Sequence, residues 1–264
     1  PNHASTPVSP SFDTIGPMAR SVADVARIFA VIAGYDSRDP LSKDHPLLNF
    51  LPNLNDGVNG IRIGIPRNFY LENLHPEIEK AFDDAAKTLE RLGATLVDID
   101  VPGAAESQRW ATIFIFSDAC AFHNDRLKQQ PDKFSKGVYD RMTSGFSYTN
   151  LDYADAMRAR EMWKLELANV FNSVDIILSP TLPTLVPPVE EDKSLLEATK
   201  DATRNTYAGA LGQIPGLSVP CGFTSDGLPI GLQLEAAWWN EPMLLTVGNA
   251  YQTQTDWHLR KPNI

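Results

Sequence analysis

Cys120 and His123 are the first residues whose types and spacing could do chemistry, because a thiol and an imidazole three residues apart share one side of a helix. A nucleophilic cysteine, however, needs a position that stabilises its thiolate, usually a helix N-terminus, and the middle of a predicted helix gives none. Free cysteines are most often buried packing residues. We therefore interpret Cys120 as core packing, and Cys221, in a predicted strand, in the same way.

The remaining titratable residues form no catalytic pattern. Asp98 and Asp100 alternate along a predicted strand, which a solvated strand face explains better than a catalytic pair of carboxylates. No nucleophile elbow, Ser-x-x-Lys, His-Glu-x-x-His, Walker or dinucleotide-binding motif is present. No ligand-like spacing links the other histidines, His3, His45, His75 and His258. The adjacent Trp238 and Trp239 are interpreted as packing anchors. We predict neither a cofactor nor a metal.

The bulk composition limits the class of protein. The chain has 264 residues, of which 43% are hydrophobic, enough to bury the core of one large or two small domains. A net charge of −10 argues against nonspecific binding to nucleic acid or to anionic membranes. No apolar run reaches membrane-spanning length, no secretory signal pattern is present, and two distant cysteines argue against a disulfide scaffold. The sequence predicts an intracellular, cytoplasmic globular protein with no nucleic-acid or membrane partner.

A helix is predicted close to the start of the chain. Ser21 and Asp24 have the spacing of a capping box, and apolar residues then recur at intervals of three and four. Gly34 follows at the position where a left-handed C-terminal cap is expected. Upstream, Pro7 and Pro10 predict that residues 1–10 form a stiff, extended arm.

The rest of the chain alternates between strand and helix patterns. A helix opened by His75-Pro76 and closed by Gly93 separates two strands, so the three elements form a β-α-β unit with parallel strands. Further helices are predicted over 107–130 and 153–171, up to Leu211, and over 242–252. A buried strand is predicted over 174–180, and two strands flank the Asp226-Gly227 turn as a hairpin. The pattern predicts an α/β layered fold with a mixed β-sheet flanked by helices.

Several motifs resemble those of the amidase-signature family. The segment SFDTIGPMARSVADVARIFAVIAGYDSRDP, over 11–40, is similar to the stretch that follows the catalytic core in that family. GIRIGIPRNFY, VDIILSPTLPTLVPP and IPGLSVPCGFTSDGLPIGLQLEA resemble its later strands and loops, in the same order. The resemblance covers nearly the whole chain and implies one C-terminal portion of an amidase-signature domain. Its expected parts are the arm at 1–10, a helix and connector at 11–60, the β-α-β unit at 61–102, a variable helical region at 103–173, and strands and helices at 174–264.

The resemblance also implies a reaction. Members of the family hydrolyse a carboxamide C–N bond with a Ser–cis-Ser–Lys triad, in which a serine attacks and backbone N–H groups of a glycine-rich loop hold the oxyanion. These motifs precede the segment that starts at Ser11, where this sequence has only PNHASTPVSP. No catalytic residue can therefore be assigned here. We expect a chain that is inactive alone, that exposes apolar surface where the missing N-terminal part would pack, and that could form a homodimer.

The expected role of this portion is to wall the cleft for a small-molecule amide. The resemblance places seven substrate-binding candidates on two segments: Thr181, Leu182, Pro183, Tyr207, Leu211, Gln213 and Ile214. Phe114, Tyr139 and Met142 are weaker candidates for the outer wall. Core packing remains the alternative for each of these residues.

One departure from the family pattern bears on the substrate. Many relatives have Asn-x-x-Gly-x-Pro before the first strand of the hairpin region, whereas this chain has Ala210 and Gln213 at the Asn and Gly positions. The change favours an amide with an apolar or aryl part over glutamine. Two alternatives to such an amidase stay open. One is a subunit of a glutamine-dependent tRNA amidotransferase, and the other is a non-catalytic fragment or pseudoenzyme that serves binding or assembly.

Overall fold

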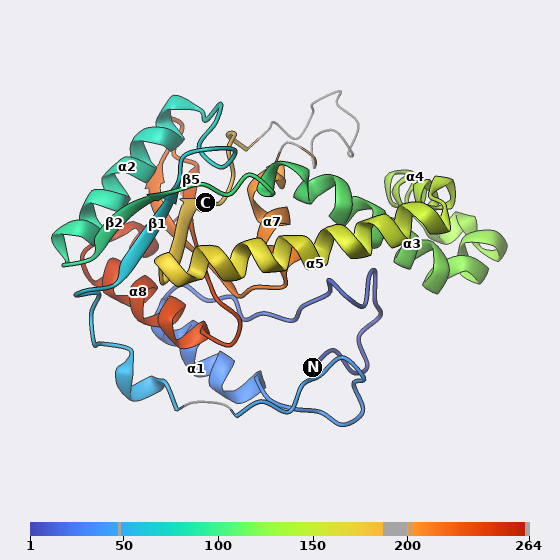
Figure 1. The fold of residues 1–264 in the computed structure, drawn as a ribbon, viewed down its shortest axis with the longest axis horizontal. Coiled ribbons are helices and arrows are strands. Elements are labelled where there is room, and N and C mark those ends of the chain that lie inside the picture. The colour runs from blue at the N-terminus through green and yellow to red at the C-terminus, as the bar shows by residue number, and fades with distance from the viewer. Residues whose placement is uncertain (47–48, 187–199, 201, 262–264) are drawn as a thin grey trace.

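The fold is built around one five-stranded sheet. The structure is a computed structural model, which describes residues 1–46, 49–186, 200 and 202–261. The strands are β1 (Arg62–Pro66), β2 (Thr95–Ile99), β3 (Ile176–Pro180), β4 (Gly216–Phe223) and β5 (Pro229–Ala236), in the order β2-β1-β3-β5-β4. β2, β1 and β3 are parallel, whereas β5 is antiparallel to both β3 and β4. The predicted α/β fold with a mixed sheet is confirmed (Figure 1).

The β-α-β unit forms as predicted. β1 and β2 pair in parallel, with Arg62 opposite Thr95, and α2 (Pro76–Arg91) connects them. His75 caps this helix, because its ring nitrogen accepts the N–H of Glu77, and proline at the first helical position needs no N–H partner. The apolar side of α2 then lies buried against the sheet.

The predicted hairpin is also confirmed. β4 and β5 are antiparallel and are joined by the turn at Gly227, whose φ of 80° is one that glycine adopts without strain. Side chains alternate along β5, so that Ile230, Leu232 and Leu234 lie on one face of the sheet and Gln233 and Glu235 on the other.

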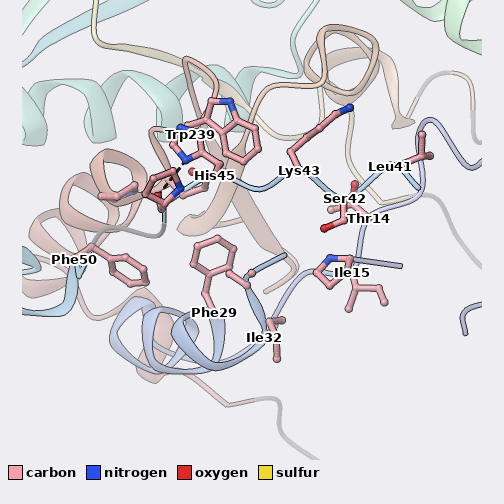
Figure 2. Close-up of a pocket in the computed structure, with 16 residues that line it drawn as sticks. Thr14, Ile15, Phe29, Ile32, Leu41, Ser42, Lys43, His45, Phe50 and Trp239 are labelled. Carbon is pink, nitrogen blue, oxygen red and sulfur yellow. Dashed lines mark hydrogen bonds between the residues drawn. The ribbon is translucent and has the colours of Figure 1, made fainter. Parts of the chain in front are cut away.

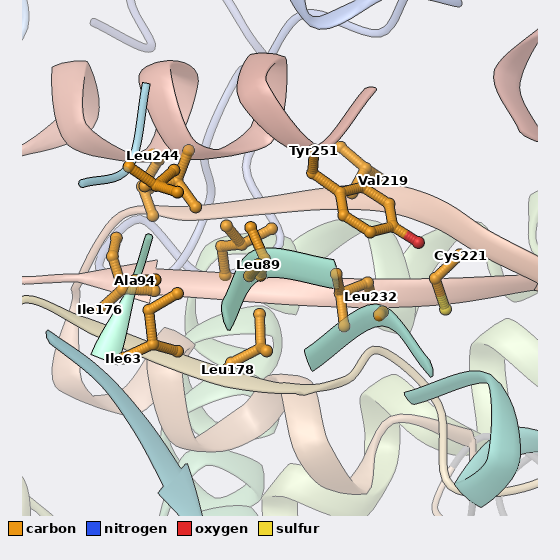
Figure 3. Close-up of a cluster of buried hydrophobic side chains, with 14 of the residues drawn as sticks. Ile63, Leu89, Ala94, Ile176, Leu178, Val219, Cys221, Leu232, Leu244 and Tyr251 are labelled. Carbon is orange, nitrogen blue, oxygen red and sulfur yellow. The ribbon is translucent and has the colours of Figure 1, made fainter. Parts of the chain in front are cut away.

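Helices cover both faces of the sheet. One face packs against α2, α1 (Val22–Ile32) and α8 (Glu241–Thr253), and the apolar core between them is the larger of two (Figure 3). The other face packs against α3 (Ala104–Gln129), α5 (Asn150–Ser173) and α7 (Arg204–Gly212), around the second core. α3 and α5 extend well beyond the sheet and carry α4 (Lys136–Thr143) at their far end (Figure 1).

Three details differ from the sequence predictions. Between α3 and α5 the chain forms α4, begun by the Ser135 cap, together with 3₁₀ turns at Pro131–Lys133 and Ser144–Ser147. α1 ends because Ala33 is extended, and Gly34 has a φ of 149°, so the left-handed cap expected at Gly34 is wrong. Only half of the capping box forms, since the Asp24 carboxylate accepts the Ser21 hydroxyl instead of a backbone N–H. Short 3₁₀ turns at Leu51–Asn53 and Trp257–Leu259 complete the fold.

The N-terminal arm is not fully extended. Residues 1–10 contain no helix or strand, but the chain turns back at Ala4, and the Ser5 N–H donates to the Asn2 carbonyl. The Asn2 N–H donates to Asp39 and the Ser9 hydroxyl donates to Asp118 of α3. These long-range hydrogen bonds fix the arm on the surface more firmly than its prolines alone would. The motif VDIILSPTLPTLVPP ends at 187–188, outside the described residues.

Candidate functional site

The candidate substrate residue Tyr207 lies in a groove between α3, α4, α5 and α7. The groove has a volume of about 540 Å³ and holds both apolar and charged side chains. Ile113, Phe116 and Tyr148 supply its apolar part. A concave site that is mostly apolar with a few convergent polar groups is the usual form of a small-molecule site. We call it the Tyr207 groove.

Cations gather in the Tyr207 groove of this otherwise acidic protein. Arg109, Arg141 and Lys200 line it, opposed by Asp152. The Asp152 carboxylate is the capping-box partner of Thr149 at the start of α5, and it accepts the Thr149 hydroxyl and N–H. These hydrogen bonds lower the pKa of Asp152. The Arg141 Nε is buried and has no acceptor among the described residues. Arg109 is paired with Glu106 at 3.4 Å, so the group without a partner that lies beside the aromatic surface is the Arg141 Nε.

The position of α7 sets the position of Tyr207, and hydrogen bonds hold α7 along its whole length. The buried Asn205 amide donates to the backbone carbonyls of Tyr70 and Pro180. The Trp163 indole N–H donates to the Ala208 carbonyl, and the Trp238 indole N–H donates to the Gly212 carbonyl. Trp238 is thus an anchor, as predicted, whereas the same prediction is wrong for Trp239, which is 48% exposed and lines a surface groove. Since both ends of α7 are fixed to other elements, Tyr207 sits on a rigid support.

Gln213 and Ile214 line a different cavity from Tyr207. They lie just beyond α7, where Gln213 adopts a left-handed φ of 56° that is uncommon for a residue with a side chain. Their cavity, of about 780 Å³, lies between the N-terminal arm, α5 and the segment that follows α7. The Gln213 side-chain amide donates to the Ser11 carbonyl and so links this turn to the arm.

The other candidates have varied surroundings. Thr181 is half-buried at the end of β3, with its hydroxyl 2.7 Å from that of Ser218, and the Pro183 carbonyl accepts the His75 N–H. Leu182 is half-buried and Pro183 is buried. Leu211 and Phe114 lie within the second core, at 1% and 2% exposure, so neither reaches a surface. Tyr139 and Met142 are half-buried on α4, and the Met142 carbonyl accepts the Cys120 thiol.

A buried carboxyl group lies beneath α7, at a position where sequence patterns did not predict one. Glu235 of β5 is 3% exposed, and its Oε2 has no hydrogen-bond partner among the described residues. Burial raises its pKa to about 8, and the nearby Gln233 and Tyr70 side chains offset only part of that rise. Gly209 of α7 lies directly against it, since a Cβ there would overlap Glu235 Oε1. Burial therefore favours the neutral form of this carboxyl group.

A separate, apolar groove lies beside α1. Phe29, Ile32, Leu41 and Phe50 line it, and Trp239 also faces it, stacked on the His45 ring at 4.1 Å between ring centres (Figure 2). Several large apolar side chains on α1 and on the segments that flank it are exposed, among them Ile15, Met18, Val31 and Tyr35. Exposed apolar surface of this kind is typical of a surface that packs against other protein.

The sequence interpretation of the cysteines is confirmed. Cys120 and Cys221 are buried, and desolvation raises the pKa of both thiols, so neither is a ready nucleophile. Asp98 is exposed and pairs with Arg67, as expected for a solvated strand face. Within the described ranges, no cluster of three metal-ligating side chains occurs, and no helix has the length and apolar character to span a bilayer.

Comparison with known proteins gives the family. The family model described as Amidase matches residues 1–245. An amidase from Pseudomonas putida is 33% identical over 96% of this chain. A glutamyl-tRNA(Gln) amidotransferase subunit from Chloroflexus aggregans is 36% identical, also over 96% of it. The chain therefore belongs to the amidase-signature family, as its motifs predicted.

The solved structures agree, and they show how much of a relative the chain represents. A chain from a vestigial protein complex, solved in work on the origins of an s-triazine catabolic enzyme, superposes with a TM-score of 0.88 at 27% identity, over 97% of this chain and 56% of that one. A crystal structure of an amidase gives a TM-score of 0.79 at 28% identity, over 94% and 54%. The chain likewise spans 56% and 57% of the two curated relatives.

Proposed function

We propose that this chain forms the substrate-cleft wall of an amidase that hydrolyses a carboxamide C–N bond. The serine nucleophile, its bridging serine and its lysine come, in this proposal, from protein outside the 264 residues, since the resemblance places them before the Ser11 segment. The observation that carries the proposal is the Tyr207 groove. In a member of the amidase family, a candidate substrate residue lines a groove of a size that fits a small molecule.

The groove also suggests which amide it takes. Ile113, Phe116 and Tyr148 favour the apolar or aryl part that the sequence departure at Gln213 suggested. Arg141 and Arg109 would hold a negatively charged substituent on the same molecule, because a guanidinium matches a carboxylate with two parallel hydrogen bonds.

The remaining candidates have proposed roles at other parts of the cleft wall. Gln213, Ile214 and Thr181 remain proposed substrate contacts there. Leu211 and Pro183, which are buried, would support the wall from beneath.

The test uses the longer protein, carrying the sequence upstream of Pro1, and a panel of amides with and without a carboxylate. Arg141→Met and Tyr207→Ala should each raise KM for the charged amide by about tenfold with a smaller effect on kcat, because both contacts bind substrate in the ground state as well as in the transition state. Matched controls are Arg126→Met, an exposed arginine on α3, and Phe122→Ala, an exposed aromatic residue on α3 outside the groove. If the longer protein hydrolyses no amide of the panel, and releases no ammonia from glutamine with companion subunits present, the non-catalytic alternative is left.

A second candidate is the tRNA amidotransferase subunit, supported by the 36% identity to the Chloroflexus aggregans protein. In that case glutamine would be the amide, and release of ammonia from it would require companion subunits. Glutamine turnover that exceeds turnover of every aryl amide in the panel would favour this candidate.

A further inference from the structure

A buried arginine without an ion-pair partner lines the cavity between the N-terminal arm and α5, which we call the arm cavity. Arg160 of α5 is 8% exposed, and no described carboxylate forms an ion pair with it, unlike its helix neighbours Arg158 and Lys164. Its Nε is buried and has no acceptor in the described part of the chain, and its Nη2 donates to the Ser11 hydroxyl over a long 3.3 Å. Burying an unpaired charge is costly, so a cation in such a position calls for an anion.

Two aromatic rings hold the guanidinium in place. Arg160 Cζ lies 3.8 Å from the centre of the Phe114 ring and 4.5 Å from that of Phe12. These contacts attract the positive charge without using any of its N–H donors. The planar group is therefore fixed in orientation while most of its hydrogen-bonding capacity stays free.

The carboxylate of Asp118 acts on Arg160 only from a distance. Asp118 of α3 is near enough to favour the charged form of the guanidinium, but its two oxygens accept the hydroxyls of Ser9 and Tyr153. Glu161, the next residue on α5, also acts on Arg160 through space while it pairs with Lys164. Neither carboxylate therefore satisfies the Arg160 N–H groups.

The acidic residues that line the arm cavity are mostly occupied elsewhere. Asp13 accepts the backbone N–H groups of Val8 and Ser9, and Asp39 accepts those of Asn2 and Leu41. Glu241 also lines the neighbouring apolar groove, which Arg160 does not reach.

Near Arg160 the cavity wall adds more donors. Lys164 follows one helical turn later on α5 and also lines the cavity, with its Nζ 3.4 Å from Glu161. The Gln213 turn and Phe12 complete this end, so that amide and ring surface surround the two cations. A carboxylate here would meet charge, N–H donors and a ring face together.

We propose that Arg160 binds a carboxylate in the arm cavity, at a site separate from the Tyr207 groove. The fixed planar fork favours a carboxylate, which it can hold with two parallel hydrogen bonds. That carboxylate belongs either to a small molecule or to an Asp or Glu side chain of protein beyond these 264 residues.

The test measures binding of benzoate to the 264-residue chain by ligand-detected NMR, with benzyl alcohol as the uncharged analogue of the same ring. Benzoate should bind with a Kd below about 10 mM and the alcohol at least about tenfold more weakly. All the chains compared carry Arg141→Met, which removes a cation of the Tyr207 groove that could hold the same carboxylate. In that background Arg160→Met, which keeps the apolar stem, should abolish the preference. Arg160→Lys should keep part of it, because an ammonium retains the charge without the fork.

Arg158→Met is the matched control, since Arg158 lies on the same helix two positions earlier but is exposed and paired with Asp155. It should bind benzoate as the unchanged chain does. Circular dichroism and thermal unfolding establish whether each variant is folded. If Arg160→Met does not fold, the comparison of Arg160→Lys with the unchanged chain still tests the proposal. Equal binding of benzoate and benzyl alcohol, or equal benzoate binding by Arg160→Met and the unchanged chain, would overturn the proposal.

The same titration on the longer protein separates the two sources. Benzoate binding that persists there identifies a small-molecule site. Benzoate binding that is lost there, and regained when Asp and Glu side chains of the added part are neutralised, identifies a protein carboxylate. Neither titration requires the protein to hydrolyse an amide, so the result of each is independent of the amidase proposal.

Discussion

The two faces of the sheet are built from the same strands but bury different chemistry. On the face under α2 and α8, β3 and β5 present apolar side chains that are all at 0% exposure, namely Ile176, Leu178, Leu232 and Leu234 (Figure 3). On the face under α7, the same two strands present Ser179, Gln233 and Glu235, which are buried almost as fully. The side chains are therefore buried to a similar degree on both faces. The faces differ in that the second also buries polar side chains.

The difference separates what holds the fold from what positions the candidate site. Apolar side chains stabilise by burial in any well-packed arrangement, so the first face needs only matching volume. Buried polar groups are costly unless they find partners, and Ser179 Oγ, Gln233 Nε2 and Glu235 Oε2 have none among the described residues. Of these groups, the Glu235 carboxyl lies directly beneath α7, the helix that carries Tyr207. Unsatisfied polar groups often mark functional regions, where stability is given up for position.

The largest effect should come from the apolar face. Leu232→Ala removes a side chain that is 0% exposed at the centre of the first core, and the surrounding residues can fill the cavity only in part. We expect the free energy of unfolding to fall by about 2–5 kcal/mol. Urea unfolding followed by circular dichroism measures the change. Leu228→Ala, at an exposed position beside the hairpin turn, serves as the control and should change stability little.

A smaller effect is expected from the helix that covers the polar face. Gly209→Ala places a methyl group where Glu235 Oε1 lies, so the carboxyl group, which is 3% exposed, must shift. Overpacking of this kind should lower the free energy of unfolding by about 1–3 kcal/mol. The double variant Gly209→Ala with Glu235→Ala should recover part of the loss. Additive effects of the two changes in urea unfolding would show that the two positions do not interact.

Sequence patterns predicted the apolar face well and the polar face poorly, for a physical reason. The alternation of Ile230, Leu232 and Leu234 predicts a strand with one buried face, and it assigns Gln233 and Glu235 to solvent. Both are buried instead, Glu235 beneath Gly209 of α7, and the pattern of a strand carries no information about what packs on its second face. The β-α-β unit was predictable because its strands, caps and crossover are local in sequence.

The candidate site was predictable only where family motifs reach it. Tyr207 was identified by resemblance, and it does line a groove. Arg141 and Arg109 were missed because α4 and α3 bring them there from distant segments without any motif. Arg160 was missed because helical patterns treat an arginine as exposed, and only tertiary packing against aromatic rings buries it.

The smallest and most specific effect concerns the protonation of Glu235. Its pKa is about 8 in the folded chain, where burial favours the neutral form, against an ordinary value of 4.5. Below pH 4.5 the group is protonated in both the folded and unfolded chains, so folding changes no proton binding there. As the pH rises from 4.5 to 8, the unfolded chain releases the proton and the folded chain keeps it, so stability falls across that window.

Glu235→Gln should remove this dependence, because an amide of the same shape stays neutral at every pH. We expect the free energy of unfolding of the variant to exceed that of the unchanged chain by on the order of 1–2 kcal/mol at pH 8, and to equal it at pH 4. The gain at pH 8 is smaller than full linkage gives, because protein and water relax around a buried charge. Urea unfolding of both chains at each pH measures the difference in their free energies of unfolding. The titration of the other groups cancels in this difference because both chains contain them. Glu106→Gln, at an exposed position on α3, should show no such pH dependence. A gain that is equal at pH 4 and pH 8 would mean that Glu235 is already ionised in the fold, and that the polar face holds a charge instead of a neutral acid.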